Sequence, residues 1–463
     1  MKQTLNFFLL LIAIIISGNL SAQTEHSYTD ANGDIWKYYL NGSTAQIFDI
    51  TGPNVIDVAV ERKKLPGHYK TFHVYQRDIL EVPSTVSDGT NTYTVTDFAT
   101  NSMHAVKKVI IPATVTRLYL FHEQYQRVEF APGSQLTSMS NLSLGGYLEE
   151  GDLSPLGQII YYDFTGVNIT GVTTWWYEMP DNALLFTDVT SDLSYATLHY
   201  RRDFVGDDLK ANHVKGGVCN QLKINDKEIF ESPRSFTATQ ASYTRTFSNT
   251  SGKAVSTLYL PYPTDLPTGM QAYEFIFKGL DEDGNKAFCF SPIPLGTRLE
   301  AYHPYLVRIT DGASHTLPTM HNVQVPVTPA ISTTARTSGD GDWAFYGTTM
   351  FIDNPEAYAR KAYYLNGNKW WAVQNGVAND YIAPYRCFIS SPTGATPAKS
   401  FFMVLDDDNS ATYIRHLESD TESAIKSGRY PFYSIDGKLM GNDYDALERG
   451  QMYIVNGKKF YKF

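Results

Sequence analysis

The sequence predicts a mainly β fold: a stacked-repeat solenoid, then one or more β-sandwich-like modules, and a C-terminal hairpin. The 463 residues include 32 tyrosines and 25 phenylalanines, which favour strands, and glycine or proline interrupts nearly every stretch. A short motif recurs in the N-terminal third, and Asn-Gly pairs join strand-like runs. Helical signals are few and short, so we expect no helix to organise a domain.

The recurring motif predicts the solenoid. Three copies share an apolar–x–apolar run that ends near a proline: 80–86 (LEVPSTV), 109–115 (VIIPATV) and 128–134 (VEFAPGS). Alternating apolar residues are typical of a strand with one face inward, and proline cannot donate to a neighbouring strand. The copies start 29 and then 19 residues apart, so the repeat is degenerate. We expect parallel rungs roughly 5 Å apart, with Val82, Ile111 and Phe130 in one shared core.

Residues 92–136 resemble the BspA-like class of bacterial surface leucine-rich repeats. The segment 93–99 (YTVTDFA) followed by 109–116 (VIIPATVT) is similar to that family's "YTVTSIG..AF" and "L..V.IP.SVTSIG". The glycine after the Thr-Val-Thr segment is absent here, and the stretch after Val115 is shorter. The resemblance implies a degenerate leucine-rich repeat on an exported, adhesin-like protein.

Five segments are predicted along the chain. Residues 1–22 have the features of a cleaved signal peptide, because Lys2 precedes an apolar run that is too short to span a membrane. A cap should cover the first rung, which otherwise exposes an apolar face. The remaining segments are an N-terminal β-hairpin cap (24–78), a degenerate leucine-rich repeat region (79–205), the β-sandwich-like module or modules (206–427) and a C-terminal hairpin or sorting-like tail (428–463).

The last two segments also carry resemblances. Residues 206–427 resemble the β-rich module that follows such repeats in secreted proteins of Bacteroidota. Residues 433–460 resemble the C-terminal tail of many secreted proteins of that phylum, including type IX sorting domains. A closing hairpin that merely completes a sheet is the alternative for this tail.

Short sequence motifs predict the positions of several individual elements. Asn-Gly pairs predict three hairpin turns, at 41–42, 366–367 and 456–457, because this pair accepts positive φ at both positions. Asp353 followed by Pro355 predicts a short helix that runs to about Lys361. The run 159–166 (IIYYDFTG) predicts a further rung.

Composition narrows the classes of partner. A net charge of −10 and a pI near 5.6 offer no basic patch for a phosphate backbone, so nucleic-acid binding is not expected. No apolar run of membrane-spanning length is seen after the signal peptide. Cys219, Cys289 and Cys387 are too few for a disulfide framework; we expect three buried thiols, with one bridge as the alternative.

No specific catalytic constellation is found, so we predict no catalytic residue, metal or cofactor. Four acidic runs, at 149–152, 281–285, 339–342 and 406–409, are typical of solvated loops and turns. The alternative is a catalytic carboxylate pair for 149–152 and a calcium site for each of the other three. His68 and His73, or His315 and His321, are pairs that a fold can bring together, but satisfied surface histidines are the favoured interpretation.

Aromatic pairs are the binding candidates. Trp175, Trp176 and Tyr177 are consecutive, as are Trp370 and Trp371. Adjacent side chains on a strand point to opposite faces, so one ring of each pair is a candidate for stacking on a sugar or anchoring a protein. The alternative is core packing on one face and a loop contact on the other.

Three functions from different classes follow. The first hypothesis is a secreted or cell-surface, non-catalytic, adhesin-like interaction protein that binds a protein or glycan partner; a periplasmic location is the alternative. The second is a glycan-binding accessory protein that uses exposed tryptophans. The third is a secreted hydrolase whose site residues are far apart in the sequence.

Overall fold

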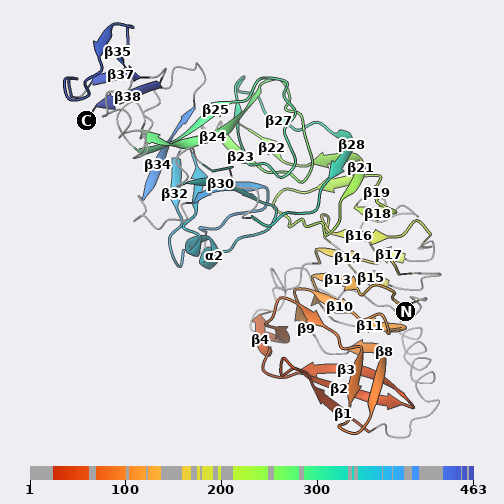
Figure 1. Ribbon diagram of the computed structural model, residues 1–463. Coiled ribbons are helices and arrows are strands. Elements are labelled where there is room, and N and C mark those ends of the chain that lie inside the picture. The colour runs from red at the N-terminus through yellow and green to blue at the C-terminus, as the bar shows by residue number, and fades with distance from the viewer. Residues whose placement is uncertain are drawn as a thin grey trace. The chain divides into compact units, whose positions relative to one another are not determined.

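A computed structural model shows a mainly β protein (Figure 1). It separates into two compact units, Met1–Val218 and Cys219–Phe463, which are described in turn. The signal-peptide prediction for 1–22 lies outside the residues that the structure describes. These are 24–61, 69–100, 104–120, 124–136, 159–167, 175–177, 180–190, 197–199, 212–248, 255–280, 286–331, 336–337, 343–367, 369–377, 379–390, 399–405, 431–449, 451–455 and 458–462.

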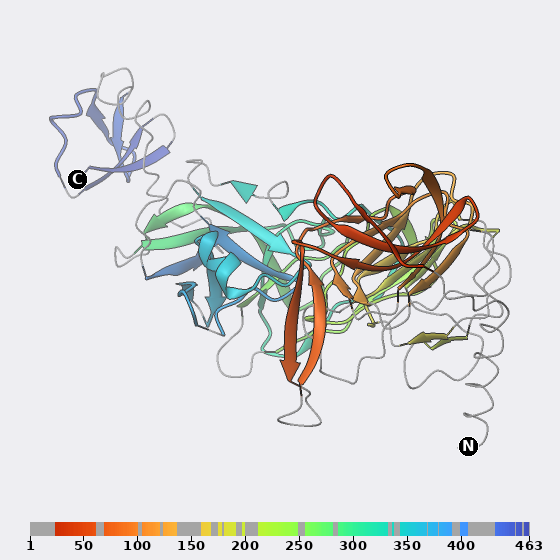
Figure 2. The same cartoon turned by 90° about the horizontal axis from the view of Figure 1, so that it is seen from below.

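The first unit begins with antiparallel strands. Asn41 pairs with Thr44 across the first Asn-Gly turn, where Gly42 has a φ of 64°, so this predicted hairpin is confirmed. A second antiparallel hairpin extends away from the other strands of its unit (Figure 2). The first hairpin group is β1 (His26–Thr29), β2 (Ile35–Asn41) and β3 (Thr44–Thr51), and the second hairpin is β4 (Val55–Glu61) and β5 (Tyr69–Tyr75).

Parallel strands then stack one above another (Figure 1). The main stack, called the ladder, consists of β6 (Leu80–Glu81), β10 (Val109–Ile111), β13 (Arg127–Phe130), β14 (Tyr161–Asp163), β16 (Leu184–Thr187) and β18 (His213–Lys215). Two shorter stacks start from the hairpins. They are β3 with β8 (Thr92–Thr100) and β11 (Arg117–Leu120), and β5 with β9 (His104–Val106) and β12 (Gln124–Tyr125). Outside these stacks, β7 (Thr85–Ser87) pairs with β8, and β15 (Trp175–Tyr177) pairs with β17 (Thr197–His199).

The register of the ladder matches the sequence recurrence. Val109 lies opposite both Leu80 and Val128, and Ile111 lies opposite Phe130. Val82 and Ile111 are buried in one cluster, and Phe130 packs against it. The predicted rungs of 79–136 are therefore present, and β14 supplies the further rung predicted at 159–166.

The second unit begins with a small group of strands. In it, β20 runs parallel to β21, and β28 is antiparallel to β21. The bounds are β19 (Val218–Cys219, at the unit boundary), β20 (Leu222–Ile224), β21 (Phe236–Tyr243) and β28 (Met320–Val325), with the short pair β22 (Thr246–Phe247) and β27 (His315–Thr316).

Most of the second unit is one ten-stranded sheet, called the curled sheet. Its order is β23 (Val255–Leu258), β26 (Tyr305–Ile309), β24 (Met270–Leu280), β25 (Lys286–Pro292), β34 (Ser400–Leu405), β32 (Lys369–Ala372), β31 (Tyr363–Asn366), β33 (Arg386–Ser390), β30 (Ala344–Thr348) and β29 (Arg336–Thr337). Asn366 pairs with Lys369, so the second Asn-Gly hairpin is confirmed.

The curled sheet is nearly closed and barrel-like, which differs from the predicted sandwich. The backbone N–H of Cys387 in β33 donates to Thr257 Oγ1 at 3.0 Å, which brings β33 against β23 from the other end of the order. A bulge in β24 between Phe275 and Phe277 increases its twist. Gly347 in β30 allows the approach, because a Cβ there would lie 1.9 Å from the ring of Tyr259.

Aromatic side chains fill the inside of the curled sheet. The rings of Phe288 and Phe401 stack at 4.4 Å, and Trp343 meets Phe288 at 5.1 Å. Such rings bury large apolar areas and account for the high aromatic content of this half of the chain. The cluster also includes Tyr259, Tyr273, Phe275, Phe290, Tyr302, Phe345, Tyr363 and Trp370.

The predicted helix and the predicted buried thiols are confirmed. Helix α2 (Asn354–Ala359) is capped by Asp353, whose carboxylate accepts a hydrogen bond from the N–H of Glu356 at 3.0 Å. All three cysteines are buried and form no disulfide bond, and burial raises the pKa of the Cys387 thiol to about 12. Among the described residues, no helix is long and apolar enough to cross a membrane.

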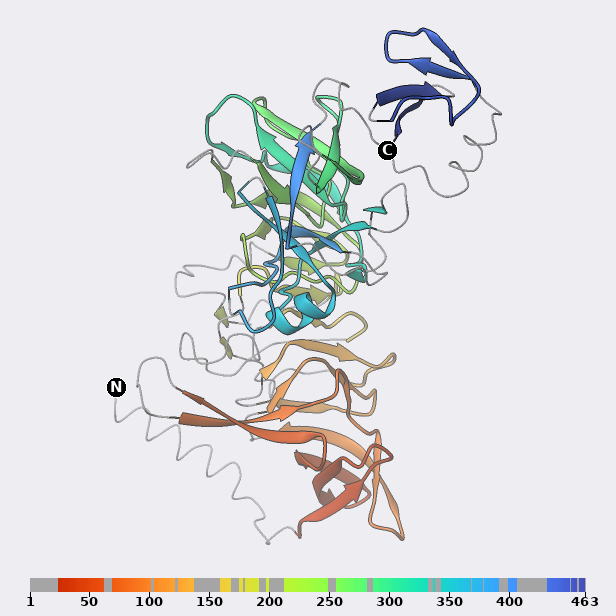
Figure 3. The same ribbon diagram turned by 90° about the vertical axis from the view of Figure 1, so that its left-hand side faces the viewer.

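The C-terminal segment forms its own four-stranded sheet, called the tail sheet and drawn in dark blue in Figure 3. Val455 pairs with Lys458, which confirms the third hairpin, although residues 456–457 lie outside the described ranges. Phe432, Tyr453 and Val455 are buried in one cluster with Leu447. The strands, in spatial order, are β36 (Leu439–Gly441), β35 (Phe432–Ser434), β37 (Gln451–Val455) and β38 (Lys458–Lys462).

Candidate functional site

The structure separates the two tryptophans of β32. Trp370 is completely buried, with its ring 5.9 Å from that of Phe290 in a stacked arrangement, so it belongs to the core and not to a binding surface. Trp371 points to the other face, is half-buried, and donates from Nε1 to the carbonyl of Asn366 at 3.3 Å. The predicted alternation is therefore present, and of this pair Trp371 remains the binding candidate.

For the other aromatic run, residues 175–177, the structure describes only the backbone. Trp175, Trp176 and Tyr177 form β15, which pairs in parallel with Thr197–His199. Their side chains lie outside the described part of the structure. The prediction that one of these rings is exposed therefore stays a prediction.

Two of the singled-out histidines are paired with carboxylates. His73 Nδ1 lies 2.6 Å from Asp57, and His315 Nε2 lies 2.8 Å from Asp311. The hydrogen bond from His315 is the main cause that lowers the pKa of Asp311. These pairs agree with satisfied surface histidines. His68 and the four acidic runs at 149–152, 281–285, 339–342 and 406–409 lie outside the described residues.

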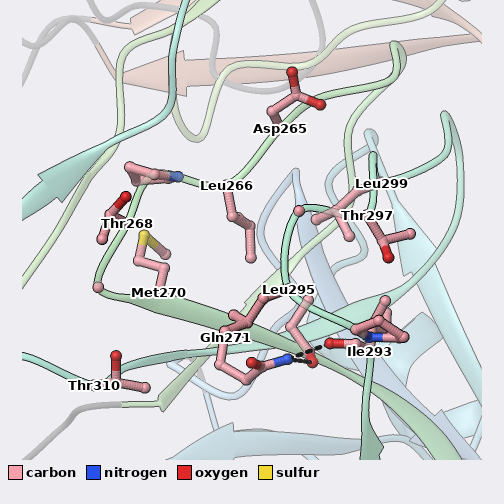
Figure 4. Close-up of a pocket in the computed structure, with 15 residues that line it drawn as sticks. Asp265, Leu266, Thr268, Met270, Gln271, Ile293, Leu295, Thr297, Leu299 and Thr310 are labelled. Carbon is pink, nitrogen blue, oxygen red and sulfur yellow. Dashed lines mark hydrogen bonds between the residues drawn. The ribbon is translucent and has the colours of Figure 1, made fainter.

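A cavity of about 410 Å³ lies between the loops at 265–269 and 293–299 (Figure 4). Leu266, Ile293 and Leu299 line it. The amide of Gln271 already donates to the carbonyls of Ala272 and Ile293, at 2.8 and 2.6 Å. The cavity therefore has an apolar lining and few polar groups free to orient a ligand.

The charges beside this cavity neutralise each other. Arg298 donates from Nε and Nη2 to the two carboxylate oxygens of Asp265, both at 2.9 Å. The pair is exposed, so it is screened by solvent. Nothing in this lining selects a particular ligand chemistry.

A second cavity, of about 580 Å³, lies beside the first rung of the ladder. Asp34 is completely buried there and accepts hydrogen bonds from Tyr75 Oη at 2.6 Å and from Asn54 at 2.7 Å. Asp30 accepts from Trp36 Nε1 at 3.0 Å. These bonds connect the loop before β2 with the end of β5, so the two buried or bonded carboxylates have a structural role.

A third cavity, called the arginine pocket, has a volume of about 300 Å³ and a polar lining. It lies where β22, β23, the β31–β32 turn and the start of β33 meet. Its lining is Arg245, Thr246, Phe247, Ser248, Val255, Ser256, Thr257, Leu365, Asn366, Gly367 and Arg386. The turn residue Asn366 also accepts the hydrogen bond from Trp371, so the remaining tryptophan candidate is adjacent to the rim.

One of the two arginines is held by a carboxylate. Arg386 donates from Nη1 and Nη2 to the two oxygens of Asp226, both at 2.8 Å. Tyr243 Oη donates to Asp226 Oδ1 at 2.5 Å. Burial raises the pKa of Asp226, but the hydrogen bond and charge of Arg386 outweigh that effect and lower it overall. Asp226 is therefore ionised and fully engaged.

The other arginine is positioned differently. Arg245 donates from Nη1 to the carbonyl of Thr257 at 2.8 Å, and its guanidinium lies 4.5 Å from the centre of the Phe247 ring. Burial and the charge of Arg386 lower the pKa of Arg245, and together they outweigh the opposing effects of Tyr243 and Asp226. The lining of the arginine pocket therefore contains two arginines and no carboxylate, within a chain whose net charge is −10.

Sequence reasoning missed this pocket. Arg386 stands in the apolar strand run 385–389 (YRCFI), and an arginine in such a run signals a charge that must find a partner. Its partner, Asp226, is 160 residues away, so no local pattern names it. Comparison with known proteins found no family model, no curated protein and no solved structure that matches this chain.

Proposed function

We propose that this chain is a secreted or cell-surface, non-catalytic, adhesin-like protein of the BspA-like leucine-rich repeat class, which binds a protein or glycan partner. The observation that carries this proposal is the ladder. Its strands pair in parallel and in register from Leu80 to Lys215, as the rungs of such a repeat would.

The outer face of the ladder offers a continuous surface. Glu81, Ile110 and Glu129 lie opposite one another on three successive strands of the ladder. Their neighbours along each strand are buried, except Phe130, which is partly buried. Lys108 Nζ lies 2.8 Å from Glu129, which also accepts a hydrogen bond from Tyr161 at 2.5 Å. Such an ordered polar face suits recognition of a partner across several rungs.

One observation favours the second candidate, a glycan-binding accessory protein. Trp371 is half-buried beside the rim of the arginine pocket, so an aromatic face and a polar cavity share one turn. Sugars stack on aromatic rings while their hydroxyl groups bond to polar side chains. In this version the second unit, and not the ladder, carries the binding site.

The two versions can be separated with the whole mature chain. It is applied to immobilised glycans and extracellular proteins, and saturable binding is expected. Glu81→Lys should weaken that binding about tenfold or more if the outer face of the ladder carries it. Trp371→Ala should do so if the second unit carries it. Each variant is the control for the other, and both changes lie outside the buried cores.

Two results would contradict the proposal. One is the absence of saturable binding to every immobilised partner. The other is turnover of a polysaccharide or peptide by the purified chain that a single substitution abolishes, because this would identify a catalytic site.

A further inference from the structure

We propose that the arginine pocket binds the carboxylate of an acidic sugar residue, with Arg245 as the cationic contact. This inference rests on the binding function proposed above and names a ligand chemistry for the second unit. It is carried by three features of the pocket: an arginine that forms no ion pair among the described residues, hydroxyl groups in the lining, and a volume near that of one sugar.

The charge balance favours an anion. The lining includes the guanidinium groups of Arg245 and Arg386 and no carboxylate side chain, and Asp226 lies behind Arg386. Both oxygens of Asp226 are engaged by Arg386, and one also by Tyr243. Within the part of the chain that the structure describes, Arg245 forms no ion pair. An arginine that is partly removed from water in this way gains from an added anion.

The geometry of Arg245 favours a carboxylate in particular. One N–H group is fixed on the carbonyl of Thr257, and the guanidinium lies over the ring of Phe247. These two contacts orient a planar group that carries five N–H donors, so donors remain for a ligand. Two parallel hydrogen bonds from a guanidinium match the two oxygens of a carboxylate.

The lining favours a hydroxylated ligand over an apolar one. Thr246, Ser256 and Asn366 line the cavity together with Arg245. Its volume of about 300 Å³ is at the small end of ligand pockets, which suits a single monosaccharide unit. Trp371, bonded to Asn366, places a ring beside the rim, where a second sugar of a chain can lie.

The test uses the full mature chain and three probes: glucuronate, glucose and acetate. Isothermal titration calorimetry should show glucuronate binding at least about tenfold more tightly than either glucose or acetate. Arg245→Gln should abolish the preference for glucuronate over glucose, with near-ultraviolet circular dichroism confirming that the aromatic core is intact. Equal binding of glucuronate and glucose, or of glucuronate and acetate, would overturn the proposal.

A second variant keeps the proposal testable if Arg245→Gln does not fold. Asn366→Asp adds a negative charge at the rim and retains a pair, Asp-Gly, that suits the same turn. It should weaken glucuronate binding about tenfold and leave glucose binding unchanged. Asn41→Asp is the matched control, because it makes the same change at the Asn-Gly turn of the first unit. If the two variants bind glucuronate equally well, the pocket is not the site.

These results are distinguishable from a failure of the proposed function. If glucuronate does not bind but the chain still binds an immobilised partner through Glu81 or Trp371, the acidic-sugar inference is wrong and the interaction role stands. If no partner of any kind binds, both fail.

Discussion

The ladder and the curled sheet bury their apolar side chains by different routes. In the ladder, each strand pairs with the next ladder strand along the chain, as Val109 does with Val128 and Val128 with Tyr162. In the curled sheet, Cys387 is held by Thr257, 130 residues earlier. The ladder is therefore built from pairings between successive strands, whereas the curled sheet depends on a few contacts between distant segments.

This difference predicts how each region fails. Damage to one rung removes the support of the rungs on either side, because every rung buries its inner face against its neighbours. Damage to a closing contact opens the curled sheet at one place and leaves its local hairpins paired. The predictions below test this comparison from the largest expected effect to the smallest.

Ile111→Asp should have the largest effect. Ile111 is completely buried in the cluster shared by the rungs, and an unpaired carboxylate there should cost more than about 4 kcal/mol. The first unit should unfold, while the aromatic core around Trp343 keeps its near-ultraviolet circular dichroism signal. Ile110→Asp is the control, because Ile110 is the next residue on the outer face and should cost about 1 kcal/mol or less. Equal melting of the two variants would contradict the ladder.

Asp226→Asn should have the second largest effect, of about 3 kcal/mol, because it leaves the largely buried guanidinium of Arg386 without its carboxylate partner. The pKa of Asp226 is lowered in the folded protein, so its stabilisation is complete above about pH 4 and is lost as the pH falls below that value. Thermal melting between pH 3 and pH 7 should show this acid-labile component in the wild type and a smaller one in the variant.

A second Asp–Arg pair of the same geometry tests whether burial is what makes the Asp226–Arg386 pair important for stability. Asp265 and Arg298 form the same two-pronged pair, but both side chains are exposed. Asp265→Asn should therefore change the melting temperature much less than Asp226→Asn. If both variants lose the same stability, the Asp226–Arg386 pair does not connect the β20–β21 segment with the curled sheet in the way described.

The comparison also explains how much could be predicted from the sequence. The parallel strands were predictable because Val109 and Ile111 belong to a motif that recurs at Leu80 and Val128. The equivalent positions of the motif are the ones that pair, so the recurrence in the sequence indicates the register. The hairpins and the helix were predictable because Asn-Gly and the Asp353 cap act within a few residues. In these elements the interacting residues are close together in the sequence, so a short stretch is enough to predict them.

The closure of the curled sheet and the arginine pocket were not predictable in this way. The alternation of Trp370 and Trp371 indicated that one ring is buried, but the choice of Trp370 depends on Phe288 and Phe290, about 80 residues earlier. The role of Gly347 depends on the ring of Tyr259. Because such contacts join distant segments, a single sequence contains no spacing that reveals them, and the predicted sandwich was wrong for this reason.

Gly347→Ala should have a smaller effect than Asp226→Asn. The added Cβ would lie 1.9 Å from the ring of Tyr259, so the ring must move and about 1 to 3 kcal/mol is expected to be lost. In a Tyr259→Ala background the same change should cost almost nothing, because the obstructing ring is gone. Chemical denaturation of the four proteins measures this coupling. Additive losses would show that the ring does not close the sheet over Gly347.

Deletion of residues 428–463 should have the smallest effect on the rest of the protein. Tyr453 and Val455 are buried in the cluster of the tail sheet with Phe432 and Leu447, and the strand pairings of the described tail residues are all within that sheet. Lys462 Nζ adds hydrogen bonds to the carbonyls of Tyr444, Asp445 and Leu447 of the same segment. A segment with its own core can be removed without opening an edge elsewhere, so the melting temperature of the remaining chain should be unchanged.

If the tail is an export or attachment signal, the truncated chain should also be lost from the cell surface, which surface labelling of intact cells measures. A lowered melting temperature with unchanged surface display would show instead that the tail completes the preceding module.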